Sequence, residues 1–443
     1  MSTKPPSGTR DFLLDDIRRR EYVIGVVRDV YEKYGFEPLE TPAFENIETL
    51  LGKYGDEGNK LIFKILKRGE HEHTGEADLA LRYDLTVPLA RVVAQYQNEL
   101  PRFFKRYQIQ PVWRADRPAR GRFREFYQCD IDALGTTSLL VEVEILSAVS
   151  EVLQRLGFQD FRIRLNDRRI LTALLTSCGI PVHLQAETLV ALDKLDKIGL
   201  DGVEKELLSR GVHQDAVNEF LGTFRRVEAL PESERDGHAW LLRELPDDPA
   251  SQHLSEIVRL SEKTAAHRKL RVDLSLARGL SYYTGTIMEI TVPDLAGSLG
   301  GGGRYDGLVG MFLGRDVPAC GFSLGLERII VVMTERKMFP ADVARGGVDT
   351  LVTIWNHETR AESLALAAEL RKSGLRVDVY PEADKLGKQF KYASARNVPF
   401  VAILGDDERA RGEVGLKDLR SGEQISVRRH ELGATIRARL RQG

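Results

Sequence analysis

Two stretches of the chain combine an arginine with apolar or aromatic residues in a pattern that suits nucleotide binding. The first, residues 112–126, contains Arg114 and ends at Phe126; the second, residues 321–328, ends at Arg328. A guanidinium group binds phosphate oxygens through parallel hydrogen bonds, and an aromatic ring at this spacing could cover a purine. We therefore expect a nucleotide site in which arginines on a rigid sheet handle the phosphates.

Glycine-rich phosphate loops do not provide an alternative site. The chain contains neither G-x-x-x-x-G-K-[ST] nor G-x-G-x-x-G. Residues 300–303 are four glycines, for which we expect a tight turn where backbone approaches a ligand closely. Between Arg102 and Arg124, eight basic residues face a single acidic one, and aromatic residues are interleaved with them. A solvated face would explain the charges alone, but the aromatic residues favour a ligand-facing pair of strands.

Composition indicates a large globular enzyme. The chain has 443 residues, 42% hydrophobic and 29% charged, with a net charge of −2. This length predicts two to four domains, because single cores stop growing at about 250–300 residues. No apolar run approaches the roughly 20 residues of a membrane helix, and the N-terminus lacks the apolar core of a signal peptide. The three cysteines are isolated, which favours a cytoplasmic location and disfavours a structural zinc site.

Periodicity divides the chain into segments of different character. Residues 1–166 and 266–338 mix helical and strand patterns and predict one catalytic core, interrupted by a leucine-rich, charged helical insertion at 167–265. A glycine- and proline-bearing linker at 339–347 precedes residues 348–443. That last segment alternates strand and helix, which predicts a small α/β domain with a mainly parallel sheet.

Individual elements are expected as follows. Helices are predicted at 13–34 and 138–156, and strands at 79–82, 107–113, 126–133, 270–274 and 286–292. In the last segment, strands are predicted at 350–355, 376–380 and 400–404, and helices at 360–373 and 385–397.

The motifs resemble those of class II aminoacyl-tRNA synthetases. Residues 35–42 (GFEPLETP) resemble motif 1, 113–126 motif 2 and 321–328 motif 3. Two sharper stretches, 276–285 (LARGLSYYTG) and 302–308 (GGRYDGL), resemble the histidine-specific signatures of the histidyl-tRNA synthetase family. The resemblance covers nearly the whole chain, including GTRDF near its start.

The resemblance implies a fold and an activity. The fold is an α+β catalytic core with a mainly antiparallel sheet of six or seven strands flanked by helices, a helical insertion, and a C-terminal α/β anticodon-binding domain. The activity is that of a histidine–tRNA ligase: histidine and ATP form histidyl-adenylate and pyrophosphate, and histidine then passes to the 3′-terminal adenosine of its tRNA. Mg²⁺ and a homodimer are implied as well. The chain would work in the cytoplasm, with tRNA(His), L-histidine and ATP as partners and no membrane.

By the same resemblance, arginines carry the catalysis. Arg114 would contact the α-phosphate and the histidine carboxylate, and Arg278 would act near the α-phosphate where related enzymes use a metal ion. Arg328 and Phe126 would cover the two faces of adenine. The residues implied in ATP binding are Arg114, Asp116, Arg122, Phe126 and Arg328.

The histidine site is implied in the same way. Asp84, Thr86 and Gln128 would hold the α-amino group. The implied histidine-binding set is Asp84, Thr86, Arg114, Gln128, Asp132, Arg278, Tyr282, Tyr283 and Tyr305. Ser281 departs from the aspartate more usual in the family, which puts the placement of Tyr283 in doubt.

Other features stay open. The candidate tRNA contacts are Arg117, Arg120, Lys388 and Gln389, whose charges could equally be solvated. No metal site is assigned, and His71-Glu72-His73 is expected to be a solvated loop. The alternative function is an inactive paralogue that binds histidine as the regulatory subunit of ATP phosphoribosyltransferase; the retained arginines and the C-terminal segment oppose it.

Overall fold

The computed structural model describes residues 3–69, 74–235, 238–245, 247–277, 282–344 and 347–441. The chain forms two compact units, residues 1–338 and 339–443. No helix within the described ranges is long and apolar enough to cross a bilayer.

The first unit is built on an eight-stranded sheet with strand order β1-β5-β6-β11-β10-β9-β7-β8. Its outermost pairs, β1 with β5 and β7 with β8, are parallel, and the other pairs are antiparallel. The prediction of a mainly antiparallel core sheet is thus confirmed. The sheet has one strand more than the six or seven expected, because the two-residue edge strand β1 is counted. The strands are β1 (Glu37–Pro38), β5 (Phe104–Trp113), β6 (Glu125–Leu134), β7 (Arg162–Asp167), β8 (Leu270–Val272), β9 (Thr286–Thr291), β10 (Gly300–Arg304) and β11 (Ala319–Gly325).

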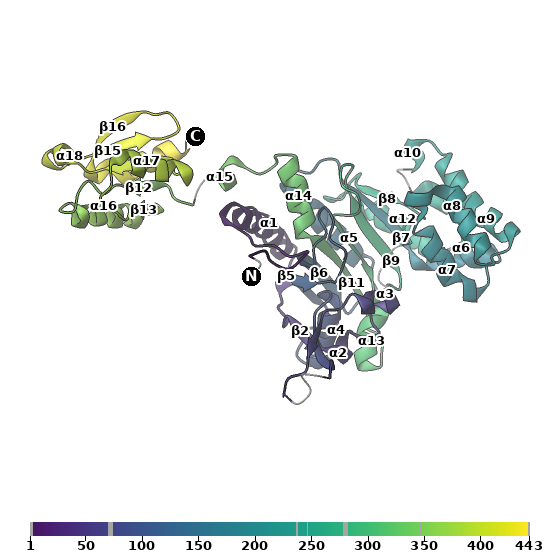
Figure 1. Cartoon of the computed structure of the whole chain (residues 1–443). Coiled ribbons are helices and arrows are strands. Elements are labelled where there is room, and N and C mark those ends of the chain that lie inside the picture. The colour runs from purple at the N-terminus through teal and green to yellow at the C-terminus, as the bar shows by residue number, and fades with distance from the viewer. Residues whose placement is uncertain are drawn as a thin grey trace. The chain divides into compact units, whose positions relative to one another are not determined.

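Three helices cover one face of this sheet: α1 (Leu14–Lys33), α5 (Leu140–Arg155) and α14 (Leu326–Glu335) (Figure 1). Val23, Val27 and Tyr31 on α1 are buried at helical spacing, and the Tyr31 hydroxyl donates to the Cys129 carbonyl at 3.2 Å. Because strand side chains alternate, the same packing leaves Gln128, Asp130 and Asp132 of β6 on the opposite face. That opposite face is called the catalytic face below.

The rest of the core adds a second small sheet and helices beside the catalytic face. The small sheet has the order β2-β4-β3, and α13 packs against α4. These elements are β2 (Phe44–Asn46), α2 (Ile47–Leu50), α3 (Gly55–Lys60), β3 (Lys64–Leu66), β4 (Ala77–Leu81), α4 (Thr86–Gln95) and α13 (Asp306–Leu313).

Between β7 and β8 the described residues form helices and no strand. They are α6 (Arg168–Ser177), α7 (Val182–Leu192), α8 (Leu195–Ser209), α9 (Gln214–Glu228), α10 (Glu232–Arg235), α11 (Ala239–Glu244) and α12 (Pro249–Ser261). Asp167, the last residue of β7, caps α6 through the Arg169 amide, so the chain leaves the sheet directly into these helices. Helix α12 packs back against α5 and β7.

The glycine run at 300–303 is a strand, not the tight turn that we expected. It forms most of β10, between β9 and β11. A Cβ at Gly302 would lie 2.2 Å from the Gly321 carbonyl oxygen, and one at Gly303 would lie 2.5 Å from the Thr286 carbonyl oxygen. The glycines are therefore required by close packing of neighbouring strands rather than by a change of chain direction.

The second unit has a five-stranded sheet with order β13-β12-β14-β15-β16. β12 is parallel to β13 and β14, whereas β14, β15 and β16 are antiparallel. The prediction of a mainly parallel sheet was wrong, because it did not include the antiparallel hairpin at 413–428. The elements are α15 (Ala341–Ala344), β12 (Thr350–Val352), α16 (Arg360–Lys372), β13 (Val377–Val379), α17 (Leu386–Ala395), β14 (Phe400–Ile403), α18 (Asp406–Arg411), β15 (Glu413–Asp418), β16 (Gln424–Arg428), the 3₁₀ turn Arg429–Glu431 and α19 (Leu432–Arg441).

Candidate active site

A row of polar side chains lies across the catalytic face. Gln128, Asp130 and Asp132 of β6 pair in register with Gln110, Gln108 and Arg106 of β5. On the other side of β6, Asp132 lies opposite Gly321 of β11, where a Cβ would lie 1.8 Å from the Asp132 Oδ1 atom. The bare backbone at Gly321 makes room for the carboxylate.

Asp132 accepts a hydrogen bond from the Tyr305 hydroxyl through Oδ1, and its Oδ2 atom lies 2.9 Å from Arg106. Burial raises the pKa of the Asp132 carboxyl, and Arg106 and Tyr305 offset part of that rise. Tyr283 is close enough to Asp132 for the carboxylate to contribute to the raised pKa of its phenol, of which burial is the main cause. A carboxylate flanked by phenol rings is suited to accept an N–H from a small heteroaromatic ring.

A second buried carboxylate, Asp84, lies in the turn before α4. Its Oδ1 atom accepts from the Tyr54 hydroxyl and the Val87 amide, both at 3.0 Å, and its Oδ2 atom accepts from the Tyr282 hydroxyl at 3.2 Å. Burial raises the pKa of Asp84, and these hydrogen bonds and Arg114 oppose the rise. A buried, oriented carboxylate of this kind can hold an ammonium group.

Two of the residues assigned to the α-amino group lie on different elements. Thr86 begins α4, directly after the Asp84 turn. Gln128 donates from Nε2 to the Ser323 hydroxyl at 2.8 Å, and its buried Oε1 atom has no hydrogen-bond partner among the described residues. An acceptor left without a partner costs free energy unless a ligand donates to it.

Arg114 is held between two aromatic rings. Its Nε atom donates to the Tyr83 carbonyl at 2.9 Å, and its guanidinium carbon lies 4.2 Å from the centre of the Tyr83 ring and 5.2 Å from that of Phe126. Fixing the guanidinium in this way preorganises it for an anion.

Arg122 and Arg114 both act electrostatically on Arg328. Burial first, and then Arg122 and Arg114, lower the pKa of Arg328. Arg328 donates from Nε to the Gly121 carbonyl at 3.3 Å and from Nη1 to the Ser298 carbonyl. Asp116, another of the residues implied in ATP binding, pairs with Arg122 at 2.8 Å. Like charges held near one another favour a ligand with several negative charges.

Three of the four assigned tRNA contacts are exposed, and the fourth is buried. Arg117 is exposed, and Lys388 is exposed and pairs with Asp384 at 2.9 Å. Arg120 pairs with Glu335 and also donates to the Asp294 carbonyl at 3.0 Å.

Gln389 differs from the other assigned tRNA contacts, because it is fully buried. Its amide accepts from the Ile354 amide and donates to the carbonyls of Ile354 and Asp384. Its polar atoms thus hold Ile354, just after the end of β12, and its role as a tRNA contact stays a prediction.

Several assigned residues lie outside the described residues. They are Arg278 and Ser281 in the stretch 278–281, and His71-Glu72-His73. The stretch 278–281 follows a turn at 273–276 that is well anchored: Arg164 donates to Asp273 at 2.8 Å and to the Ser275 hydroxyl at 2.9 Å.

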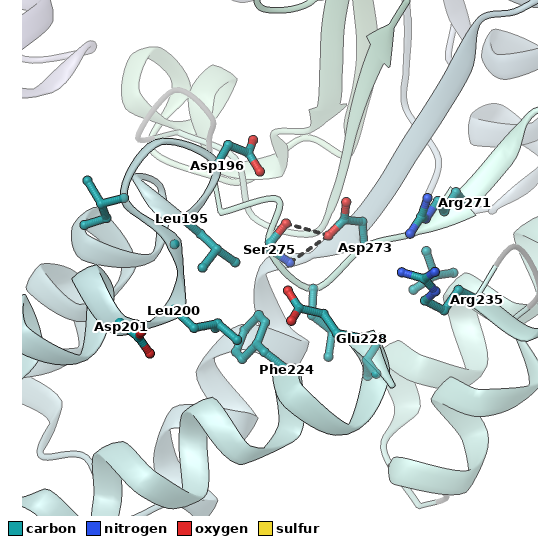
Figure 2. Close-up of a pocket in the computed structure, with 15 residues that line it drawn as sticks. Leu195, Asp196, Leu200, Asp201, Phe224, Glu228, Arg235, Arg271, Asp273 and Ser275 are labelled. Carbon is teal, nitrogen blue, oxygen red and sulfur yellow. Dashed lines mark hydrogen bonds between the residues drawn. The ribbon is translucent and has the colours of Figure 1, made fainter. Parts of the chain in front are cut away.

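One wall of a cavity of about 640 Å³ is formed by residues 271–275, and α8, α9 and Arg235 form the rest (Figure 2). Arg271 and Arg235 gather at one end, and Leu195, Leu200 and Phe224 form an apolar part. Among the assigned ATP- and histidine-binding residues that the structure describes, none lines this cavity.

Sequence reasoning missed Arg106, Asp130 and Tyr54. The spacing of Gln128, Asp130 and Asp132 on a predicted strand could have indicated Asp130, because alternate residues share a face. Arg106 and Tyr54 gave no such signal, since their placement depends on strand register and on a loop far away in the sequence.

Comparison with known proteins places the chain in a family. A family model described as histidyl-tRNA synthetase matches residues 8–329, and one described as an anticodon-binding domain matches residues 349–439. The chain belongs to the histidyl-tRNA synthetase family. The expected family and fold class are thereby confirmed.

Relatives of this family match nearly the full length. The chain is 43% identical to a histidine–tRNA ligase of Porphyromonas gingivalis, covering 95% of each chain, and 41% identical to that of Flavobacterium johnsoniae, covering 96% and 98%. The structure of histidyl-tRNA synthetase from Nostoc sp. PCC 7120 superposes with a TM-score of 0.83 at 32% identity, covering 99% and 100%.

Proposed function

We propose that this chain is a histidine–tRNA ligase that forms histidyl-adenylate from L-histidine and ATP and then charges tRNA(His). The observation that carries the proposal is the proximity of two sites, linked by Arg114, which acts electrostatically on both Asp84 and Arg328. Buried Asp84 and Asp132 suit the ammonium and the ring N–H of histidine, and Arg114, Arg122 and Arg328 suit a polyphosphate. The full-length relatives named histidine–tRNA ligase support the same activity.

In the first step the histidine carboxylate attacks the α-phosphorus of ATP and pyrophosphate leaves. Arg114, fixed between Tyr83 and Phe126, stabilises the charge that develops on the α-phosphoryl oxygens. Arg122 binds the outer phosphates, and Phe126 and Arg328 enclose adenine. Arg278 is assigned beside the α-phosphate by family resemblance. In the second step a hydroxyl of the terminal adenosine attacks the carbonyl carbon and AMP leaves.

Mg²⁺ would enter with ATP and offset charge on its phosphates. Within the described segments, no three His, Cys, Asp or Glu side chains come together as a metal site. An ion that enters with ATP can be held mainly by the phosphates and by water.

We further propose that the enzyme is a cytoplasmic homodimer. Residues 35–42, the motif 1 stretch, include the edge strand β1, and Phe44 just beyond it is 51% exposed. An apolar ring beside an unpaired sheet edge is suited to burial against a second copy. Sedimentation equilibrium would show about 100 kDa for a dimer of this 49.8 kDa chain and the monomer mass otherwise.

The decisive test is exchange of labelled pyrophosphate into ATP, with each amino acid in turn. Exchange with histidine alone supports the proposed activation step. Histidine binding without exchange would instead favour the regulatory-subunit function. A structure described as an ATP phosphoribosyltransferase regulatory subunit/histidyl-tRNA synthetase, from Bacillus halodurans C, has a TM-score of 0.72 at 21% identity, and this likeness concerns the fold alone.

A further inference from the structure

A fully buried arginine lies beneath the proposed histidine-ring site. Arg106 on β5 has no exposed surface, and its Nη2 atom lies 2.9 Å from Asp132 and 3.8 Å from Asp130. Its Nη1 atom donates to Gln108 Oε1 at 3.1 Å, and Nη2 donates to the Leu85 carbonyl at 3.3 Å. Because its guanidinium is fully buried beneath the two carboxylates, this arginine is not placed to touch phosphate.

The cluster of Arg106, Asp130 and Asp132 carries one positive and up to two negative charges away from water. Asp130 and Asp132 are each only 2% exposed. Isolated buried carboxylates take up a proton, and two close together resist double ionisation, whereas a cation within about 4 Å favours the charged form. Arg106 and Asp130 therefore act on Asp132 in opposite directions.

The ionisation of Asp132 decides what it can recognise. As a carboxylate it accepts from Tyr305 and retains lone pairs for the ring N–H of histidine. If Asp132 were protonated, it would present an O–H donor in place of one of these lone pairs. The Leu85 contact also ties the same guanidinium to the residue between Asp84 and Thr86, where the α-amino group is expected.

We propose that Arg106 and Asp130 are positioning residues that set the ionisation and orientation of Asp132, and so determine the affinity for the histidine ring. The inference rests on the proposed function, which supplies histidine as the ligand. Arg106 favours the ionised form of Asp132, which accepts hydrogen bonds, and Asp130 disfavours that form.

Other titratable groups face Asp132 from neighbouring elements. Asp84, before α4, disfavours its ionisation. Asp130 and Asp132 repel each other when both are ionised, and this repulsion contributes to the raised pKa of Asp130. Tyr305 favours ionisation through its hydrogen bond. Three further groups among the described residues interact with Asp132, one thiol and two phenols, and burial raises the pKa of each. These neutral groups are Tyr283 on the catalytic face, Cys320 on β11 and Tyr31 on α1.

The test compares the pH dependence of kcat/KM for histidine in pyrophosphate exchange among three variants. Arg106→Met should raise the KM for histidine at least about 10-fold at neutral pH and move the acid limb about one unit to higher pH. Because Asp130 and Asp132 repel each other, the acid limb belongs to the pair of carboxylates and not to Asp132 alone. Asp130→Asn removes this repulsion and should move the same limb to lower pH. The double variant, which restores the net charge of the cluster, should fall between them. Titration of histidine itself is common to all and cancels in the comparison.

Arg106→Met leaves two carboxylates buried without a cation and can fail to fold, so Arg106→Lys is the second variant at this position. It keeps the charge but loses the planar fork, and should retain the wild-type acid limb with a smaller rise in KM. The proposal would be overturned if Arg106→Met and Asp130→Asn moved the acid limb of the pH profile in the same direction. It would also be overturned if neither variant moved the limb and only kcat was reduced. Absence of histidine-dependent exchange in the wild type would instead refute the proposed function.

Discussion

Three carboxylates on the catalytic face, those of Asp84, Asp130 and Asp132, are buried before any ligand binds. Burial raises the pKa of each. Ionisation of these carboxylates therefore lowers the stability of the folded chain. Binding of a ligand that carries an ammonium group and a ring N–H offsets this cost. This is an expected property of a site built to bind a cationic ligand, because preorganised polar groups oppose folding.

The sign of this cost can be tested for Asp130. Burial, then Asp132, raise its pKa to about 7, with Arg106 opposing, whereas an aspartate in an unfolded chain titrates near 3.9. Between these values the folded chain holds the extra proton, so this group lowers the free energy of unfolding as the pH rises from about 4 to about 7. In urea unfolding, Asp130→Asn should remove that component. Asp273, whose pKa is lowered, acts on stability in the opposite sense. The quantity to examine is therefore the free energy of unfolding of the wild type minus that of the variant. If this difference did not depend on pH, the prediction would be contradicted.

Arg114 is expected to need its planar fork and not merely its charge. Lysine cannot donate to the Tyr83 carbonyl, stack on Phe126 and bind a phosphoryl group bidentately at once. Arg114→Lys should lower kcat/KM in pyrophosphate exchange about 100-fold. Arg117→Lys, at an exposed position of the same loop, is the matched control and should stay within about 2-fold for this step. Comparable losses in both would assign the effect to loop structure.

At the scale of elements, the sequence located α1, α5, β5 and β6 closely, because their periodicity is strong. It did not reveal which strands are neighbours. Asp132 meets Arg106 and Gly321 only through the registers of β5 and β11, and register is a property of the assembled sheet. The glycines of β10 were misread for the same reason, since the crowding that requires them comes from distant strands.

The register leads to a prediction for Gly321. A Cβ there would lie 1.8 Å from Asp132 Oδ1, so Gly321→Ala must displace the carboxylate or the strand. We expect a loss of about 1–3 kcal/mol in stability and a higher KM for histidine. Gly25 on α1 has no atom within 4 Å of its Cβ position, so Gly25→Ala should stabilise the chain by up to about 1 kcal/mol. Thermal unfolding and exchange kinetics of both variants check this; an active, stable Gly321→Ala enzyme would refute the register argument.

At the scale of the whole molecule, the two units have separate hydrophobic cores. In the second unit, Phe400 and Leu416 of the sheet pack with Leu366 and Leu370 of α16. All residues assigned to histidine and ATP belong to the first unit, residues 1–338. The C-terminal unit matches an anticodon-binding domain and contributes none of them. Activation and tRNA selection should therefore be separable.

A chain ending at Met338 should keep activation and lose charging. With every assigned activation residue retained, pyrophosphate exchange should stay within about 10-fold of the full-length rate. Charging should fall by at least about 100-fold in kcat/KM for tRNA, because losing about 3 kcal/mol of anticodon-end binding weakens association by that factor. Circular dichroism first establishes that the shortened chain folds cooperatively. If the folded chain lost exchange and charging equally, the C-terminal unit would have to support the activation site; if charging survived, tRNA recognition would belong to the first unit.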